Sequence, residues 1–257
     1  MNRRSILAAA LLAALALLPA LVARADLLEQ GVYKLYQGDR PLGTETFEYV
    51  TTNDSLVVRA RQNLTVPTSR GDEKFQKGAD ILINTEHMTM RGYQSTRVFR
   101  GTTVIRGLVF ADTHYVAYRE GEGEFATGDS YVLPPGHLYV MDSQIISLFD
   151  ILCRNLSGTS LERRPIHLLA LGPRDTMLDA VVVERGTETI RWGGKPVVAH
   201  KMDIVADSRT TFTAWTGTKG QLLRLTEPVS GLRVQREPPA VRRKTAPSPA
   251  PPPKPGG

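Results

Sequence analysis

Five histidines and one cysteine are the side chains of this chain that are best suited to bind a metal or to act in catalysis. The histidines are widely spaced along the sequence: His87, His114, His137, His167 and His200. Zinc sites use ligands at close spacing, so this distribution predicts no metal site. The serine-hydrolase pattern G-x-S-x-G and a glycine-rich phosphate loop are also absent. We therefore predict a protein that is not an enzyme and that has no catalytic residues, metal or cofactor.

Cys153 is the only cysteine, so the chain cannot form an internal disulfide. It falls near the C-terminal end of a predicted helix, where the negative end of the helix dipole disfavours a thiolate. We interpret Cys153 as a small buried apolar residue. The alternative is a hydrolase whose site is assembled from dispersed residues, for instance His167 or His200 beside a carboxylate.

Side chains alternate with a period of two from residue 31 to about residue 131. Val58, Ala60 and Val66 fall on one face of a predicted strand, and Arg59 and Arg61 fall on the other. Turn-forming residues interrupt this pattern at short intervals, which is typical of antiparallel hairpins and leaves no room for helical crossovers. Further strands are predicted over residues 166–171, 177–184, 189–192, 197–205, 210–216, 222–226 and 232–235.

One segment, residues 142–156, departs from this alternation. Its apolar residues recur at three- and four-residue spacing, which predicts one face of a helix: Ile145, Ile146, Leu148, Phe149, Leu152 and Leu156. Asp142 or Ser143 is expected to cap its first N–H groups. A single amphipathic helix must bury its apolar stripe against the strands. We predict a mainly β fold, with a large curved antiparallel meander sheet (an open or half barrel) packed on one amphipathic helix.

The sequence divides into three parts: residues 1–25, 26–236 and 237–257. Arg3 and Arg4 precede a run of Ala and Leu, and residues 23–25 fit the small-x-small cleavage rule. This predicts a signal peptide and a periplasmic or secreted mature protein, not an integral membrane protein after cleavage. An uncleaved anchor, and export by the twin-arginine rather than the general secretory route, are the alternatives.

The C-terminal segment, residues 237–257, contains eight prolines and almost no large apolar residue. Such a composition predicts a disordered tail. The net charge of +6 comes from this tail and from the signal segment, because the body from Asp26 to Arg236 has equal numbers of acidic and basic residues. A nucleic-acid-binding domain concentrates positive charge on its folded surface, so we expect no nucleic-acid partner.

Two stretches carry a resemblance to a known group of proteins. Residues 31–38 (GVYKLYQG) continue through Pro41 to Glu45, and residues 214–225 (AWTGTKGQLLRL) precede Pro228 and Gly231. The chain from Asp26 to Arg236 resembles uncharacterised exported bacterial proteins that are grouped as domains of unknown function. This likeness implies a long, strongly curved antiparallel sheet wrapped around one helix, similar in outline to the lipoprotein carriers LolA and LolB. It implies no catalytic residue.

These predictions favour a carrier or binding protein for an apolar or lipid ligand, held in a groove between sheet and helix. The candidate groove residues come from the helix and from two tryptophans: Ile145, Leu148, Phe149, Leu152, Trp192 and Trp215. The alternative is a structural or adaptor protein of the cell envelope that reaches a partner through the basic, Pro-rich tail.

Overall fold

The computed structural model of the chain describes residues 26–52, 55–85, 89–121, 127–142, 144–157, 162–172, 175–206 and 211–239. The predicted signal peptide, residues 240–257 of the predicted tail, His87 and Ser143 lie outside these ranges.

One helix and fifteen strands make up the described part of the chain. The first eight strands form consecutive hairpins: β1 (Asp26–Gln37), β2 (Arg40–Thr52), β3 (Ser55–Thr68), β4 (Gly71–Asn84), β5 (Met90–Phe99), β6 (Thr102–Phe110), β7 (His114–Gly121) and β8 (Thr127–Val132). The remaining elements are β9 (Leu138–Met141), α2 (Ile146–Leu156), β10 (Arg163–Ala170), β11 (Thr176–Trp192), β12 (Lys195–Val205), β13 (Thr211–Thr216), β14 (Leu222–Glu227) and β15 (Leu232–Arg236).

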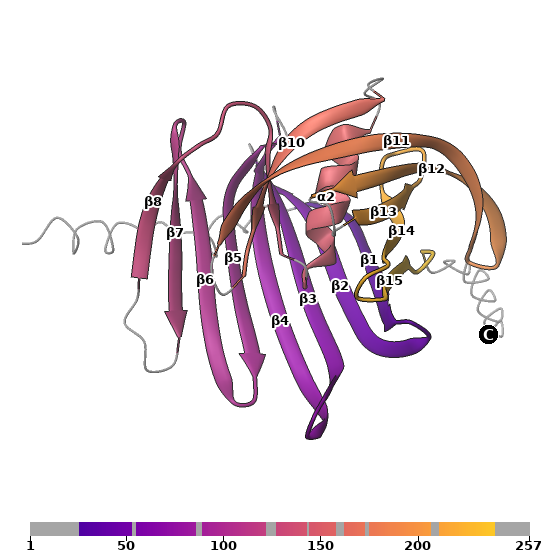
Figure 1. Cartoon of the computed structure of the whole chain (residues 1–257), viewed down its shortest axis with the longest axis horizontal. Helices are drawn as coiled ribbons and strands as arrows, with labels where there is room; N and C mark the ends of the chain where they lie inside the picture. Colours follow the sequence, from indigo (N-terminus) through magenta and orange to yellow (C-terminus); the bar gives the residue numbers. More distant parts are fainter. Residues whose placement is uncertain are drawn as a thin grey trace, which may run out of the picture.

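All fifteen strands belong to one sheet, in the order β8-β7-β6-β5-β4-β3-β2-β1-β15-β14-β13-β12-β11-β10-β9. The sheet curves strongly, and helix α2 lies in its concavity (Figure 1). The predicted fold class, a curved and mainly antiparallel meander sheet on one helix, is therefore confirmed. The alternation that predicted it follows from the pleat, because successive side chains of a strand point to opposite faces.

The first and last strands meet in the interior of this sheet. β1 pairs with β15 in antiparallel register, with Tyr33 opposite Arg236 and Gln37 opposite Leu232. The pairing continues one residue further, because the Glu237 N–H donates to the Val32 carbonyl at 2.8 Å. Two series of strands, β1–β8 and β9–β15, are thus joined along one seam.

Two details differ from the sequence prediction. β9 and β10 pair in parallel, because the segment between them contains α2 and so has the length that a crossover needs. In addition, β11 is one continuous strand across the two strands predicted at 177–184 and 189–192. A register shift between Glu184 and Thr187 lets it continue, as expected of a bulge that bends a strand without ending it.

The main core lies between the concave face of the sheet and α2. Apolar side chains from nearly every strand belong to it, including Tyr33, Phe47, Val58, Ile81, Leu108, Ile204 and Val234. Their burial supplies most of the free energy that holds the sheet curved, since each fully buried large side chain contributes about 1.5–3 kcal/mol. A second, smaller cluster contains Ile190, Ala199, Trp215 and Leu223, with Trp192 and Val197 packed against it.

Candidate functional site

The N-terminus of α2 is capped by a residue from a distant strand. Glu45 of β2, which is fully buried, accepts hydrogen bonds from the Ile146 and Ser147 N–H groups, both at 2.8 Å, and from Ser147 Oγ at 2.7 Å. These N–H groups have no partner within a helix, and a negative charge is favourable at that end. The carboxylate therefore fixes where the helix starts relative to β2.

The local caps predicted from the sequence do not perform this role. No side chain next to the helix caps it, so the prediction for Asp142 is wrong, and Ser143 lies outside the described residues. The Asp142 carboxylate is used elsewhere. It accepts from the Tyr93 hydroxyl at 2.8 Å and from the Gln144 N–H at 3.2 Å, and it forms a buried ion pair with Lys77.

Burial perturbs the protonation of Glu45. Removal from water raises the pKa of this carboxyl to about 7, although the hydrogen bonds from Ser147 and Ile146 act in the opposite direction. Desolvation dominates because the charged form loses more hydration than these few hydrogen bonds return. Glu45 is therefore a buried group that titrates close to neutral pH.

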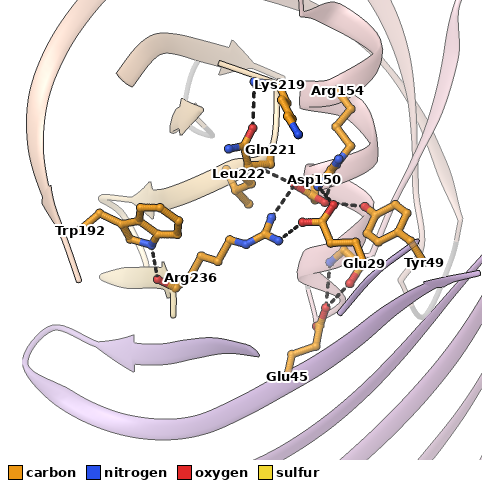
Figure 2. A network of polar contacts seen from close by, with 11 residues as sticks. Glu29, Glu45, Tyr49, Asp150, Arg154, Trp192, Lys219, Gln221, Leu222 and Arg236 are labelled. Atoms are coloured by element: carbon orange, nitrogen blue, oxygen red, sulfur yellow. Dashed lines mark hydrogen bonds and ion pairs between the residues drawn. The ribbon is translucent and has the colours of Figure 1, made fainter. Parts of the chain in front are cut away.

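A second carboxylate, Asp150, anchors the middle of α2 to both series of strands. One of its oxygens accepts from the Tyr49 hydroxyl of β2 at 2.5 Å and from Arg154 Nε at 2.9 Å. The other accepts from the Leu222 N–H of β14 at 2.6 Å and lies 3.9 Å from an Arg236 nitrogen of β15. Figure 2 shows these contacts converging on Asp150 from the helix and from strands on either side.

Glu29 of β1 extends this network toward the seam. It forms ion pairs with Arg154 of the helix, at 2.9 Å, and with Arg236 of β15. The Arg236 carbonyl in turn accepts from Trp192 Nε1 at 2.8 Å (Figure 2). Both Asp150 oxygens are occupied and the residue is fully buried, so this network positions the helix and does not resemble a reactive site.

Two of the side chains considered first for catalysis, Cys153 and His167, contact other parts of the protein. Cys153 is buried as predicted, and burial raises the pKa of its thiol well above the usual value. His167 lies 2.8 Å from Asp179, but its second ring nitrogen lies 3.0 Å from the Pro135 carbonyl oxygen. Both ring nitrogens thus face oxygen atoms of the protein, which hold the ring between β11 and the segment that precedes β9. Across the described ranges, no three metal-ligating side chains gather as a metal site requires.

An apolar pocket of about 580 Å³ opens near the β1–β2 and β14–β15 turns. Seven apolar or aromatic residues line it: Tyr36, Leu42, Val66, Pro67, Phe212, Val229 and Leu232. Its volume lies within the range of small-molecule sites, about 300–1,000 Å³. We call this site the apolar pocket.

The apolar pocket is continuous with the core beside the helix. The Phe212 ring contacts the Phe149 ring of α2, with centroids 4.8 Å apart, and Leu42 and Leu232 pack against the main core. At the rim, Val229 is 78 % exposed. The nearby Glu227 carboxylate accepts hydrogen bonds within the turn from the Val229 and Ser230 N–H groups, at 2.8 and 2.7 Å, so both of its oxygens have a partner.

The structure brings together four of the six groove residues predicted from the sequence. Ile145, Leu148, Phe149 and Leu152 all lie in the main core and are at most 2 % exposed. Trp192 and Trp215 belong to the second cluster instead. Trp215 follows the core residue Ala214 on β13, so the alternation of the strand turns its side chain to the other face.

Sequence reasoning missed the charged residues that point inward from the strands. Glu45 shares the alternation of Phe47 and Tyr49, and Lys77 shares that of Phe75 and Ala79. A charged residue in a row of core positions is rarely buried unless it has a partner. This departure from the apolar pattern is the signal that could have identified both residues.

No described helix has the length and apolar character needed to cross a membrane. No protein-family model matches the chain, and no curated protein does. The curved sheet around one helix nevertheless defines a class of fold that has been observed experimentally. The chain is similar to a crystal structure described as a beta-barrel-like protein of domain of unknown function DUF1849 from Brucella abortus. The TM-score is 0.55 and the identity 10 %, over 81 % of this chain and 94 % of the other. At this identity the likeness concerns the fold alone.

Proposed function

We propose that this chain is an exported, periplasmic binding protein that holds the hydrocarbon portion of a lipid in the apolar pocket. The observation that carries the proposal is the pocket itself, about 580 Å³ in volume and lined mainly by apolar side chains. Transfer of a hydrocarbon chain from water into such a site is favourable by roughly 25 cal/mol per Å² of buried apolar surface. The exposed Val229 at the rim extends this apolar surface to the solvent.

Two further features support a binding role over a catalytic one. The buried carboxylates Glu45 and Asp150 are satisfied by the protein itself, and His167 has both ring nitrogens engaged. The periplasmic location rests on the N-terminal sequence, and the likeness to the carriers LolA and LolB remains a prediction from sequence. Both are consistent with a ligand that needs shielding from water in transit.

A neutral fluorescent probe tests the pocket directly. We expect the mature chain to bind N-phenyl-1-naphthylamine, an uncharged apolar fluorophore, with increased emission. Val66→Lys places an ammonium group in the pocket lining, and we expect it to weaken binding at least ten-fold. Val198→Lys is the matched control, because Val198 is a strand valine that is 60 % exposed and does not line the pocket.

Native mass spectrometry of protein purified from the organism that encodes it gives a second readout. A bound lipid, absent from the Val66→Lys variant, would support the proposal. No lipid acquired from host membrane extract, or equal probe affinity in the Val66→Lys and unmodified proteins, would contradict it.

A further inference from the structure

Strand β8 lies at one lateral end of the sheet, and its outer edge faces away from the rest of the molecule (Figure 1). Among the described strands, β7 is its only neighbour. All six residues of β8 are exposed. The strand at the opposite end of the sheet, β9, is shorter, and three of its four residues are buried. Of the two outermost strands, β8 is therefore the one that offers an accessible edge.

β8 has none of the features that commonly protect an edge strand. Such protection comes from lysine, from proline, or from a bulge that bends the edge away. Residues 127–132 read TGDSYV, and their pairing with β7 contains no register shift. Two large apolar side chains of β8 are also exposed, Tyr131 at 41 % and Val132 at 71 %. An edge of this kind is suited to pair with another strand.

The hydrogen bonds to β7 determine which backbone groups of β8 point outward. The Leu133 N–H donates to the Thr113 carbonyl at 2.9 Å, at the position that follows the last β7–β8 residue pair. Bonded and non-bonded pairs alternate along an antiparallel ladder. Every second residue of β8 therefore directs its N–H and C=O away from β7, and these residues are Gly128, Ser130 and Val132.

This spacing is self-complementary. If a second copy of β8 lies antiparallel to the first, with a two-fold axis at Ser130, then Ser130 faces Ser130 of the second copy. In the same register Gly128 faces Val132 of the second copy, and the reverse holds by symmetry. All the outward backbone groups of β8 then gain partners. Because Gly128 has no side chain, nothing obstructs the valine opposite it.

Charge favours this register over the neighbouring symmetric one. A two-fold axis at Asp129 would set Asp129 against Asp129 of the second copy, and like charges at directly opposite positions destabilise a sheet. The axis at Ser130 instead sets Asp129 opposite Tyr131 of the second copy. The same register therefore satisfies the backbone and keeps the two carboxylates apart.

We propose that two copies of this chain associate through the outer edges of β8, antiparallel about a two-fold axis at Ser130, and form one sheet across both copies. The Pro-rich segment 237–257 is a poor alternative occupant, because its eight prolines lack the N–H donors that a strand needs. One short strand from each copy makes a small interface. We therefore expect a dimer that dissociates on dilution.

Sedimentation velocity over a range of concentrations tests the proposal. Ser130→Pro removes the N–H at the two-fold axis but no hydrogen bond to β7, and proline is tolerated at such an edge position. We expect it to raise the dissociation constant of the dimer at least ten-fold, whereas Ser130→Ala, which keeps the N–H, should leave it unchanged. A chain that stays monomeric at the highest concentration reached would overturn the proposal, and so would equal association of Ser130→Pro and Ser130→Ala.

Oxidative cross-linking tests the register and does not depend on how the proline variant folds. Directly opposite residues have Cα atoms about 5.5 Å apart, which a disulfide can bridge. We expect Ser130→Cys to form a cross-linked dimer on oxidation. Val132→Cys should not, because this register sets the two Val132 Cα atoms more than about 13 Å apart.

The natural thiol, Cys153, is buried, and the unmodified chain is the control for it. A dimer in which Ser130→Cys does not cross-link, or in which Val132→Cys cross-links equally well, uses another surface or register and would overturn the proposal. None of the β8 residues lines the apolar pocket. Binding of the neutral fluorophore there therefore succeeds or fails independently of this dimer.

Discussion

Glu45 illustrates how a single buried residue can couple stability to pH. Its carboxyl has a pKa of about 7 in the folded chain, against an ordinary value of 4.5. Because the pKa is higher in the folded state, the folded state carries more bound protons than the unfolded state does between pH 4.5 and pH 7. The free energy of unfolding must therefore fall as pH rises from 4.5 to 7. A shift of this size corresponds to about 3 kcal/mol.

Glu45→Gln should remove this part of the pH dependence, because the amide does not titrate. Urea unfolding at pH 5 and pH 7.5 measures it: between these values the unmodified protein should lose about 2.4 kcal/mol more than the variant. Glu48→Gln, on the same strand but exposed, should behave like the unmodified protein. Equal pH slopes for Glu45→Gln and the unmodified protein would show that the buried carboxyl does not titrate in this range.

At the scale of elements, α2 is placed by contacts that come from far along the chain. Glu45 caps it from β2, and Asp150 joins it to β14. Its C-terminal end meets the β13–β14 turn so closely that a Cβ added to Gly220 would lie 3.0 Å from the Arg154 Cα. Gly220 also has a φ of +73°. The turn thus needs glycine for two reasons, backbone conformation and close approach to the helix.

A comparison of Gly220→Ala with Gly194→Ala separates the cost of the backbone conformation from the cost of the close approach to the helix. Gly194 has a similar φ of +79° but nothing within 4 Å of an added Cβ. Its substitution should cost only the conformational penalty, about 1–2 kcal/mol. Gly220→Ala should cost clearly more, because the helix must also move. Chemical denaturation of both variants checks this, and equal losses would mean that the approach to Arg154 is not a constraint.

The faces of the strands and the position of the helix could be predicted from the sequence, but their partners could not. Alternation along β3 placed Val58 and Ala60 in the core because the pleat fixes which face each residue occupies. The spacing of Leu148 and Leu152 likewise predicted a helix. Neither pattern contains information about partners across the molecule. The cap from Glu45, the parallel β9–β10 pair and the ion-pair partner of the buried Lys77 therefore emerged only from the three-dimensional arrangement.

At the scale of the whole molecule, stability should depend on the seam between β1 and β15. Val234 of β15 is fully buried and Arg236 is 5 % exposed. A chain that ends after Ser230 lacks β15 and leaves β1 and β14 with unpaired edges, which promote aggregation. We expect it to lose cooperative thermal unfolding, as measured by circular dichroism and size-exclusion chromatography. A chain that ends after Pro239 keeps β15 and should retain the melting temperature of the full chain.

The pairing of β1 with β15 also has a consequence for synthesis. β15, which pairs with β1 in the finished sheet, leaves the ribosome after the other fourteen strands. At about 5–20 residues per second, roughly 10–40 seconds separate the two. During that time neither series of strands can close on the other. Closure of the sheet therefore waits for its last strand, and until then the nascent chain remains open in a state that a chaperone can engage.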